Sequence, residues 1–259
     1  MGDAPENSDR FYLSGSYALG YMLLSECSDE PAGIAEAVLQ QWDTAGVQRQ
    51  RLLDVGAADG RITSRLRDGF AHVEAYEPNG ILFALLRRQL PSSMVTLHNG
   101  AWRTRYAIHQ SVSHSFFSHV LYHIPISRWK TLIESAMRVE VSGRGRVATF
   151  VLWDDEAEAQ QFCRRVSSDR WHVTSADLIR LLAPSTQPPN CRWCLSTMRL
   201  APTIRIAERP AAEAVATFLL GRRHPNTLSD RNAHDELVSI LIGPGLNNSQ
   251  SIITISRCG

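Results

Sequence analysis

Residues 51–79, RLLDVGAADGRITSRLRDGFAHVEAYEPN, constrain the fold more than any other stretch of the chain. A short apolar run at 52–55 ends in a turn that contains glycines, and residues 62–66 carry apolar side chains at helical spacing. A second apolar run at 73–76 ends in an acid, Glu77. This order predicts a buried parallel strand, a tight turn, a helix and a second parallel strand, which is how nucleotide-binding α/β sheets begin.

The turn within this segment reads D-x-G-x-A-x-G, from Asp54 to Gly60. Glycine is favoured where the backbone needs a positive φ or comes close to a ligand. Glu77 lies about 20 residues beyond the turn, where a carboxylate can accept hydrogen bonds from both hydroxyls of a ribose. The turn and the acid together predict a nucleotide site, although the spacing differs from the G-x-G-x-x-G of dinucleotide-binding sheets.

The turn resembles the first motif of the class I S-adenosylmethionine-dependent methyltransferases, D/E-x-G-x-G-x-G, with Ala58 in place of the middle glycine. Residues 117–125, FSHVLYHIP, resemble the fourth motif of the same family, an apolar strand that runs into L-x-H-x-P. The resemblance covers residues 52–153. It implies a doubly wound, Rossmann-like α/β fold with a seven-stranded, mostly parallel sheet, and S-adenosylmethionine (SAM) as the cofactor.

The resemblance also implies which residues hold the cofactor. The glycines of the turn approach it, Asp54 orients the turn and meets the amino-acid end, and Glu77 holds the ribose. At the exit of the third predicted strand, 94–102, the family has an acid for the adenine amino group, whereas this chain offers the side-chain oxygen of Asn99 and the flat ring of Trp102. The expected cofactor contacts are Asp54, Gly56, Ala58, Gly60, Glu77, Pro78, Asn99, Gly100, Ala101, Trp102 and Ser118.

Two histidines, His119 and His123, lie at the end of the fourth predicted strand, with Tyr122 between them. The carboxyl end of this strand lies beside the first strand, at the switch point where α/β sheets bind ligands. Histidine is the side chain best suited to accept a proton near neutral pH, so His119, His123 and Tyr122 are the candidate catalytic residues. The alternative is that they hold the loop through hydrogen bonds.

Residues outside the cofactor motifs are candidates for binding the methyl acceptor: Tyr12, Tyr17, Tyr21, Trp153, Asp154, Arg222 and Arg223. The three tyrosines belong to an N-terminal segment that either covers the site as a lid or packs as an ordinary helix, and Gly15 and Gly20 count against a continuous helix there. Asp154 suits a cationic acceptor or caps the next helix. The arginine pair suits an anionic acceptor or a solvated turn.

The chain divides into an N-terminal lid segment, 1–30, which is expected to be helical, and a methyltransferase-like α/β domain, 31–259, with a helical insertion at about 208–248 before the last strand. Such an insertion is long enough to be functional, as an acceptor cover or an association surface. Other expected elements are a Pro- and Ser-rich loop at 183–190, a strand or strand pair at 192–207 that bends at Pro202, helices at 211–220 and 229–242, and a last strand at 251–257.

Composition limits the classes of partner. The formal net charge is +1 and the chain has no lysine- or arginine-rich tract, which argues against nucleic-acid binding. No apolar run approaches the length of a membrane span, and the polar, acidic N-terminus does not read as a signal peptide. Five thinly spread cysteines predict reduced thiols and a cytoplasmic location, and the C-x-x-C pair Cys191 and Cys194 lacks the second pair of a metal site, so no metal is expected.

The sequence therefore favours a SAM-dependent methyltransferase that acts on a small molecule, of the kind found in specialised metabolism such as antibiotic biosynthesis. Two alternatives stay open because Ala58 and Ala101 depart from the family pattern. One is a protein of this fold that catalyses an intramolecular displacement or cyclisation instead of methyl transfer. The other is a non-catalytic subunit of a heteromeric enzyme; a homodimer is equally compatible with the sequence.

Overall fold

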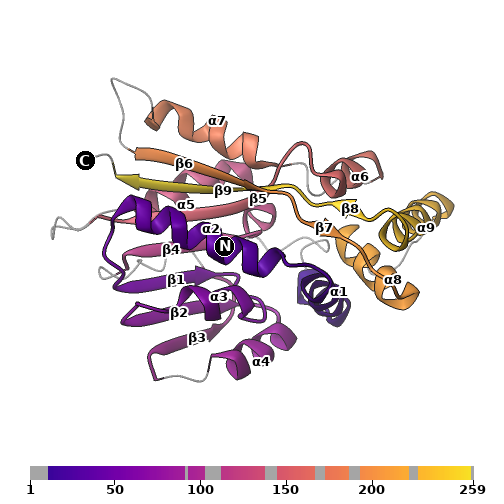
Figure 1. Ribbon diagram of the computed structural model, residues 1–259, viewed down its shortest axis with the longest axis horizontal. Coiled ribbons are helices and arrows are strands. Elements are labelled where there is room, and N and C mark those ends of the chain that lie inside the picture. Colours follow the sequence, from indigo (N-terminus) through magenta and orange to yellow (C-terminus); the bar gives the residue numbers. More distant parts are fainter. Residues whose placement is uncertain are drawn as a thin grey trace, which may run out of the picture.

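The computed structural model describes residues 11–90, 93–102, 112–137, 145–166, 173–186, 193–221 and 227–257. Its centre is a seven-stranded sheet with the order β3-β2-β1-β4-β5-β9-β6 (Figure 1). The strands are β1 (Arg51–Val55), β2 (His72–Glu77), β3 (Val95–Asn99), β4 (His114–Ser118), β5 (Val147–Trp153), β6 (Trp193–Leu200) and β9 (Gln250–Arg257). The strands that lie next to one another from β3 to β5 are parallel, and β9 is antiparallel to both β5 and β6. This arrangement confirms the predicted Rossmann-like, doubly wound sheet.

Helices cover both faces of the sheet. One face packs against α2 (Glu30–Ala45) and α3 (Arg61–Leu66), with Trp42 and Phe116 among the fully buried side chains. The opposite face packs against α5 (Ile126–Met137) and α7 (Ser175–Thr186). Side chains alternate between the two faces along each strand, and β5 is buried at every position. A strand in such a position needs mostly apolar residues, which is why 147–153 reads VATFVLW; the one polar side chain, Thr149, is hydrogen-bonded to Trp42 and Thr254.

The N-terminal segment and the insertion pack together at the carboxyl edge of the parallel strands. Figure 1 shows α1 (Gly15–Glu26), α8 (Arg209–Leu219) and α9 (Leu228–Ile242) gathered beside this edge. Leu24, Trp153 and Leu219 belong to one apolar cluster there, which joins α1, the end of β5 and the insertion. The helical insertion is therefore confirmed, and it forms one wall of the region beyond the strand ends.

The N-terminal segment is helical, as expected, although its two glycines weakened that prediction. Helix α1 runs unbroken through Gly20 because Gly20 is its point of contact with α8. A Cβ atom at position 20 would lie 2.3 Å from Cβ of Phe218 and 2.7 Å from the carbonyl oxygen of Ala214. The helix gains this close packing in exchange for the lower helix propensity of glycine.

The expected loop at 183–190 begins later than the sequence indicates. Helix α7 continues to Thr186 and contains Pro184. Leu178 and Leu182 are buried against the sheet, so the packing of this face holds the helix through Pro184 although the proline removes one helical hydrogen bond.

The remaining elements follow the sequence closely. The strand pair is β6 and β7 (Thr203–Ile204), which are separated by Pro202, and β7 pairs with β8 (Leu246–Asn247). Helix α4 (Gly80–Gln89), helix α6 (Glu158–Val166) and the short 3₁₀ helix η2 (Leu121–His123) complete the described elements. Among these helices, none is both long and apolar enough to cross a membrane.

Candidate functional site

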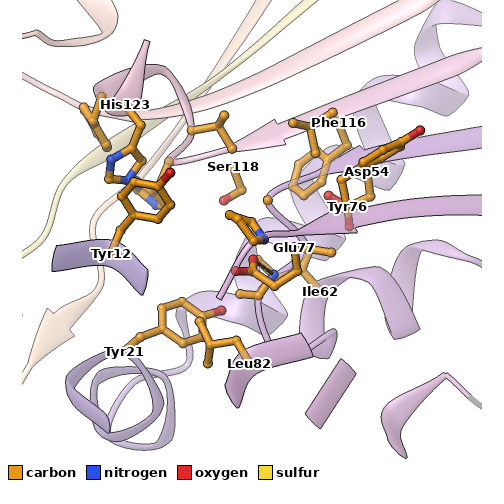
Figure 2. Close-up of a pocket in the computed structure, with 18 of the residues that line it drawn as sticks. Tyr12, Tyr21, Asp54, Ile62, Tyr76, Glu77, Leu82, Phe116, Ser118 and His123 are labelled. Atoms are coloured by element: carbon orange, nitrogen blue, oxygen red, sulfur yellow. Dashed lines mark hydrogen bonds between the residues drawn. The ribbon is translucent and has the colours of Figure 1, made fainter. Parts of the chain in front are cut away.

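A cavity of about 680 Å³ lies beyond the carboxyl ends of β1, β2 and β4. This volume is in the range of small-molecule sites. Figure 2 shows Tyr12 and His123 at one end of the view and Asp54 and Tyr76 at the other. The cavity is one continuous space, and for description we divide its lining into a cofactor half next to the ends of β1 and β2 and an acceptor half next to α1, η2 and the end of β5. The cofactor half is lined by Asp54, Gly56, Ala58, Ile62, Tyr76, Glu77, Pro78, Leu82, Ala101, Trp102 and Phe116, and the acceptor half by Tyr12, Tyr17, Tyr21, Glu30, His119, Tyr122, His123, Trp153, Phe218 and Asn248, with Ser118 between them.

The glycine turn after β1 is fixed by β2. The backbone N–H of Gly56 donates to the carbonyl oxygen of Tyr76 at 2.8 Å. Gly56 has φ +76°, and a Cβ atom there would lie 2.6 Å from Cγ2 of Val120. Both the backbone conformation and the space therefore require glycine at this position.

Ala58 keeps the turn geometry although it replaces the glycine of the family pattern. Its φ is +50°, in the left-handed region that an L-residue rarely adopts. The N–H of Ala58 donates to Oε2 of Glu77 at 2.9 Å, which holds the residue in that conformation. The alanine therefore adds strain and leaves the path of the backbone suited to a ligand.

Glu77 is buried at the end of β2 and binds two backbone N–H groups. Besides Ala58, the N–H of Asn79 donates to Oε1 at 2.6 Å. Burial raises the pKa of Glu77 to about 7, and the two backbone hydrogen bonds oppose the shift. Each carboxylate oxygen has a second lone pair, so the group can still accept hydrogen bonds from a ligand in the cavity.

Asp54 differs from Glu77 because one of its carboxylate oxygens has no hydrogen-bond donor within the described residues. The residue is 1% exposed, and Thr63 donates to Oδ2 at 2.5 Å. Oδ1 has no hydrogen-bond partner within the described part of the chain. Burial raises the pKa of Asp54 to about 7. An unpaired buried oxygen is costly, so a donor or a cation that enters the cavity gains free energy here.

Of the four residues predicted to contact adenine, two line the cavity and two do not. Ala101 and Trp102 line the cavity. Asn99 is exposed and does not line it, and Gly100 donates its N–H to the carbonyl oxygen of Glu77 at 3.1 Å and also lies outside the lining. Asn99 lies at the end of an edge strand, and its contact with the adenine amino group stays a prediction.

Gly60 does not line the cavity either. It has φ +85° and begins α3, and a Cβ atom there would lie 2.8 Å from Cδ1 of Leu86. Its place in the motif is explained by the close packing of α3 against α4. Tyr76, Ile62, Leu82 and Phe116 also line the cavity, and no motif marks them because they are apolar members of regular elements.

The acceptor half is walled by aromatic rings from separate parts of the chain. The ring of Tyr17 lies 4.9 Å from that of Phe218 in the insertion, and the ring of Tyr12 lies 5.3 Å from that of His123. Tyr21, Tyr122 and Trp153 complete the wall. The three tyrosines of the N-terminal segment therefore face the cavity, as the lid interpretation requires.

Asn79 joins this N-terminal segment to the cofactor half. Its Oδ1 accepts from the N–H groups of Ile81 and Leu82 and so caps α4. Its Nδ2 donates to the backbone carbonyl oxygens of Tyr12 at 2.8 Å and Ser14 at 3.1 Å. One side chain, two residues after Glu77, therefore holds the segment that covers the acceptor half.

The candidate bases differ in their surroundings. The hydroxyl of Tyr122 accepts a hydrogen bond from the N–H of Trp153, and burial raises its pKa well above 10. Tyr122 therefore keeps its proton near neutral pH and positions the end of β5. His119 and His123 both line the cavity, His119 with its Nε2 3.0 Å from Oε1 of Gln250.

Asp154 does not line the cavity and is neither an acceptor contact nor a helix cap. Its carboxylate accepts from Ser175 at 2.7 Å, from Ser249 at 2.9 Å and from Ser251, and it lies 2.9 Å from Nε of Arg199. These four partners occupy the group, which ties the end of β5 to β6 and β9. Trp153, its neighbour, does line the cavity. Arg222 and Arg223 lie outside the described residues.

Glu30 and Asn248 are members of the acceptor half that sequence analysis missed. Glu30 is the first residue of α2, and Asn248 precedes β9. Nδ2 of Asn248 donates to Oε2 of Glu30 at 2.7 Å. The two residues are far apart in the sequence, and no local motif marks either of them. Within the described residues, no group of three potential metal ligands is found.

Comparisons with known proteins agree with the fold. No protein-family model and no curated protein sequence matches the chain. Among solved structures, DhpI in complex with SAM and HEP superposes with a TM-score of 0.54 and 16% identity over 98% of this chain and 100% of its own. The plantazolicin methyltransferase BamL, in complex with a triazolic desmethylPZN analog and S-adenosylhomocysteine (SAH), gives 0.56 and 10% over 96% and 94%. YcgJ from Bacillus subtilis gives 0.57 and 8% over 88% and 99%.

At these identities the likeness establishes the fold, which this chain shares with DhpI and with the methyltransferase BamL. The cavity of the present chain lies where open α/β sheets bind ligands, at the carboxyl edge of the strands.

Proposed function

We propose that this protein binds SAM in the cofactor half of the cavity and transfers its methyl group to a small molecule held in the acceptor half. Bound there, SAM supplies an electrophilic methyl group on a sulfonium centre. The protein contributes two adjoining sites that share one cavity of about 680 Å³. Placing two reactants in contact and excluding water is the largest part of what such an enzyme has to do.

The observation that carries the proposal is the unpartnered oxygen of Asp54. The α-ammonium group of SAM is a donor with a positive charge, which suits Oδ1 of Asp54 in its buried position. Glu77 lies on the neighbouring strand with lone pairs left for the ribose hydroxyls. Trp102 and Ala101 border the cavity at the end expected for the adenine ring. DhpI and BamL, which share the fold, are complexes with SAM and SAH.

The acceptor is a small molecule, and we infer a role in specialised metabolism from the enclosed, aromatic character of its half of the cavity. The wall there is made by the N-terminal segment and Phe218 of the insertion. BamL, a structural neighbour, acts on plantazolicin. The conformation of Ala58, which preserves the turn, weakens the sequence argument for a non-methylating relative.

Calorimetric titration with SAM and with SAH tests the proposal. We expect both to bind with micromolar dissociation constants, and we expect Glu77→Ala to weaken binding by at least about 30-fold through lost ribose and turn contacts. Glu74→Gln is the matched control, because Glu74 lies on the same strand and does not line the cavity. Binding unchanged in Glu77→Ala, or no binding by the folded wild-type protein, contradicts the proposal.

A further inference from the structure

The imidazole of His119 lies against two oxygen atoms at the edge of the acceptor half. Its Nε2 is 3.0 Å from Oε1 of Gln250 and 3.3 Å from Oε1 of Glu30. A carboxylate oxygen accepts hydrogen bonds and does not donate them. The hydrogen of the neutral ring is therefore on Nε2, and the lone pair is on Nδ1, for which no hydrogen-bond partner is found in the described parts of the chain.

We propose that Glu30 and His119 form a proton-accepting pair that activates an aromatic acceptor carrying no negative charge. The proposal rests on the methyl transfer proposed above and assigns the base, its tautomer and the class of acceptor. His119 takes the proton at Nδ1. Glu30 is a positioning residue, which fixes the ring and stabilises the imidazolium that forms, as the acid does in other acid–histidine pairs.

The backbone of His119 supports a role in the reaction. Its φ is +55°, and within the described residues only Ala58 shares a positive φ among residues other than glycine. The N–H of His119 donates to the carbonyl oxygen of Val151 at 3.0 Å, which holds the residue just beyond the end of β4. A strained conformation that the fold maintains at the edge of a cavity is typical of a functional position.

Glu30 is itself held in place. Its side chain is 11% exposed, and Asn248 donates to its second oxygen at 2.7 Å. The other ionisable groups near His119 are accounted for: Tyr122, whose ring stacks 5.8 Å away, has a pKa well above 10, and Asp154 at the end of β5 is paired with Arg199. Glu30 is therefore the charge that the imidazolium meets.

The lining of the cavity defines the acceptor. Its acids are Glu30, Asp54 and Glu77, and among the described lining residues its one arginine or lysine is the exposed Arg128. Oδ1 of the buried Asn248 has no partner in the described structure, and its orientation is fixed because its Nδ2 donates to Glu30. The acceptor half thus offers hydrogen-bond acceptors, negative charge and aromatic rings. These select a planar molecule that brings donors, such as a neutral phenol or an aromatic ammonium compound.

The proton and electron balance of the step is complete for a phenol. The O–H bond breaks and its proton moves to Nδ1 of His119, while the oxygen forms a bond to the methyl carbon. The carbon–sulfur bond breaks and its electron pair stays on sulfur. The imidazolium then returns its proton to water. General-base assistance of this kind contributes about 10²–10⁴-fold to a rate.

Nitrogen-15 NMR of histidine-labelled protein tests the pair without any turnover. We expect the neutral ring of His119 to carry its hydrogen on Nε2 in the wild-type protein and to become a mixture of tautomers in Glu30→Ala. His119→Asn assigns the signal. A neutral ring with its hydrogen on Nδ1 in the wild type overturns the proposal.

Three phenols that differ in charge test the acceptor class: 4-methylphenol, tyramine and 4-hydroxybenzoate, titrated calorimetrically into the protein saturated with SAH. We expect the neutral and the cationic phenol to bind at least about tenfold more tightly than the anionic one. Preferred binding of 4-hydroxybenzoate, equal binding of all three, or binding of none contradicts the acceptor class.

Methylation kinetics with the phenols that bind test the base. We expect His119→Asn to lower kcat by about 100-fold or more, and Glu30→Gln to lower it by about tenfold, with the KM for SAM within about threefold of wild type. His72→Asn, at the amino end of β2, is the histidine control and keeps wild-type activity. Wild-type kcat in His119→Asn, or a larger loss in His123→Asn than in His119→Asn, overturns the assignment while SAM binding and methyl transfer still stand. A protein that does not bind SAM contradicts the proposed function itself.

Discussion

The two halves of the cavity are built in different ways. The cofactor half comes largely from one continuous stretch, β1 to the end of β2, in which backbone hydrogen bonds fix the turn and Glu77. The acceptor half is assembled from α1, the start of α2, η2, the end of β5, α8 and Asn248, mostly through side-chain packing. A site made by local backbone geometry needs particular residues at fixed spacing, whereas a site made by packing tolerates many combinations of apolar residues. The first can be recognised in a sequence, and the second cannot.

This difference predicts that a change at the chemical centre of the cofactor half affects binding without affecting folding. In Asp54→Asn, the unpaired buried carboxylate oxygen is replaced by an uncharged group of the same shape. We expect SAM affinity to fall by about 30-fold, which corresponds to about 2 kcal/mol for a hydrogen bond to a charged group. The thermal midpoint should stay the same or rise, because a desolvated carboxyl is removed. Titration calorimetry and thermal unfolding measure the two quantities, and a parallel loss of both would mean that Asp54 is structural.

A change at the packing contact of the acceptor half should have the opposite pattern. Gly20→Ala places a Cβ atom 2.3 Å from Cβ of Phe218, so α1 and α8 must separate. We expect a loss of about 2 kcal/mol in unfolding free energy from overpacking, reduced acceptor binding, and SAM affinity within about threefold of wild type. Gly33→Ala is the matched control, because the nearest atom to its Cβ would lie 3.6 Å away, in ordinary contact. Gly33 lies in α2, and its replacement by alanine should raise the free energy of unfolding by up to about 1 kcal/mol. Equal effects of the two substitutions would exclude Gly20 as a packing contact.

The affinity for SAM should depend on pH through two carboxyl groups of the cofactor half, Asp54 and Glu77. Burial raises the pKa of Asp54 and of Glu77 to about 7 in the cofactor-free protein, so both carboxyls take up a proton as the pH falls through that value. A cationic ligand needs them ionised, and we expect SAM affinity to fall by about tenfold from pH 7.5 to 5.5, with proton release on binding. Titrations in buffers with different ionisation enthalpies measure both, and Asp54→Asn should release fewer protons.

The same two groups set the sign of the effect on stability. Their pKa values in the unfolded chain are about 4, so the folded cofactor-free protein binds more protons between about pH 4 and 7. This contribution to stability is present at the lower end of that window and is lost as the pH rises through 7. Chemical denaturation should give a larger free energy of unfolding from these two groups at pH 5.5 than at pH 7.5.

The smallest effect concerns the alanine of the turn. Ala58→Gly removes a side chain from a residue with φ +50° and keeps the hydrogen bond from its N–H to Glu77. We expect a gain of about 0.5–1 kcal/mol in unfolding free energy with little change in SAM affinity. Ala57→Gly, whose φ lies outside the positive range, should instead lose stability through the greater freedom of the unfolded chain. Denaturant unfolding of the wild type, Ala58→Gly and Ala57→Gly measures both changes in unfolding free energy.

Sequence reasoning predicted the sheet, its strand spans and the cofactor half because each depends on residues close together in the chain. Alternating and continuous apolar runs gave the strands, and the acid-first turn with Glu77 gave the ligand edge. The role of Gly20 in α1 could not be predicted, because its contact, Phe218 in the insertion, is nearly two hundred positions away. Glu30 was missed for the same reason, since its partners His119 and Asn248 come from other elements.

Asp154 shows the complementary error. An acid at the exit of a central strand suggested contact with the acceptor, but the three serines and the arginine that bind it come from α7, β6, β9 and the residue before β9. Local position shows that an acid is near a ligand edge. Whether the acid faces the ligand depends on whether side chains from other elements already bind its carboxylate.

The attachment of the N-terminal segment has a consequence for redesign. Asn79 holds this segment through the backbone carbonyl oxygens of Tyr12 and Ser14, and these atoms are present whatever side chain the residue carries. The surface that Tyr12 presents to the acceptor can therefore be varied without removing the attachment. New acceptor preferences are within reach of single substitutions in the N-terminal segment, both for natural divergence and for a library built at residues 12, 17 and 21.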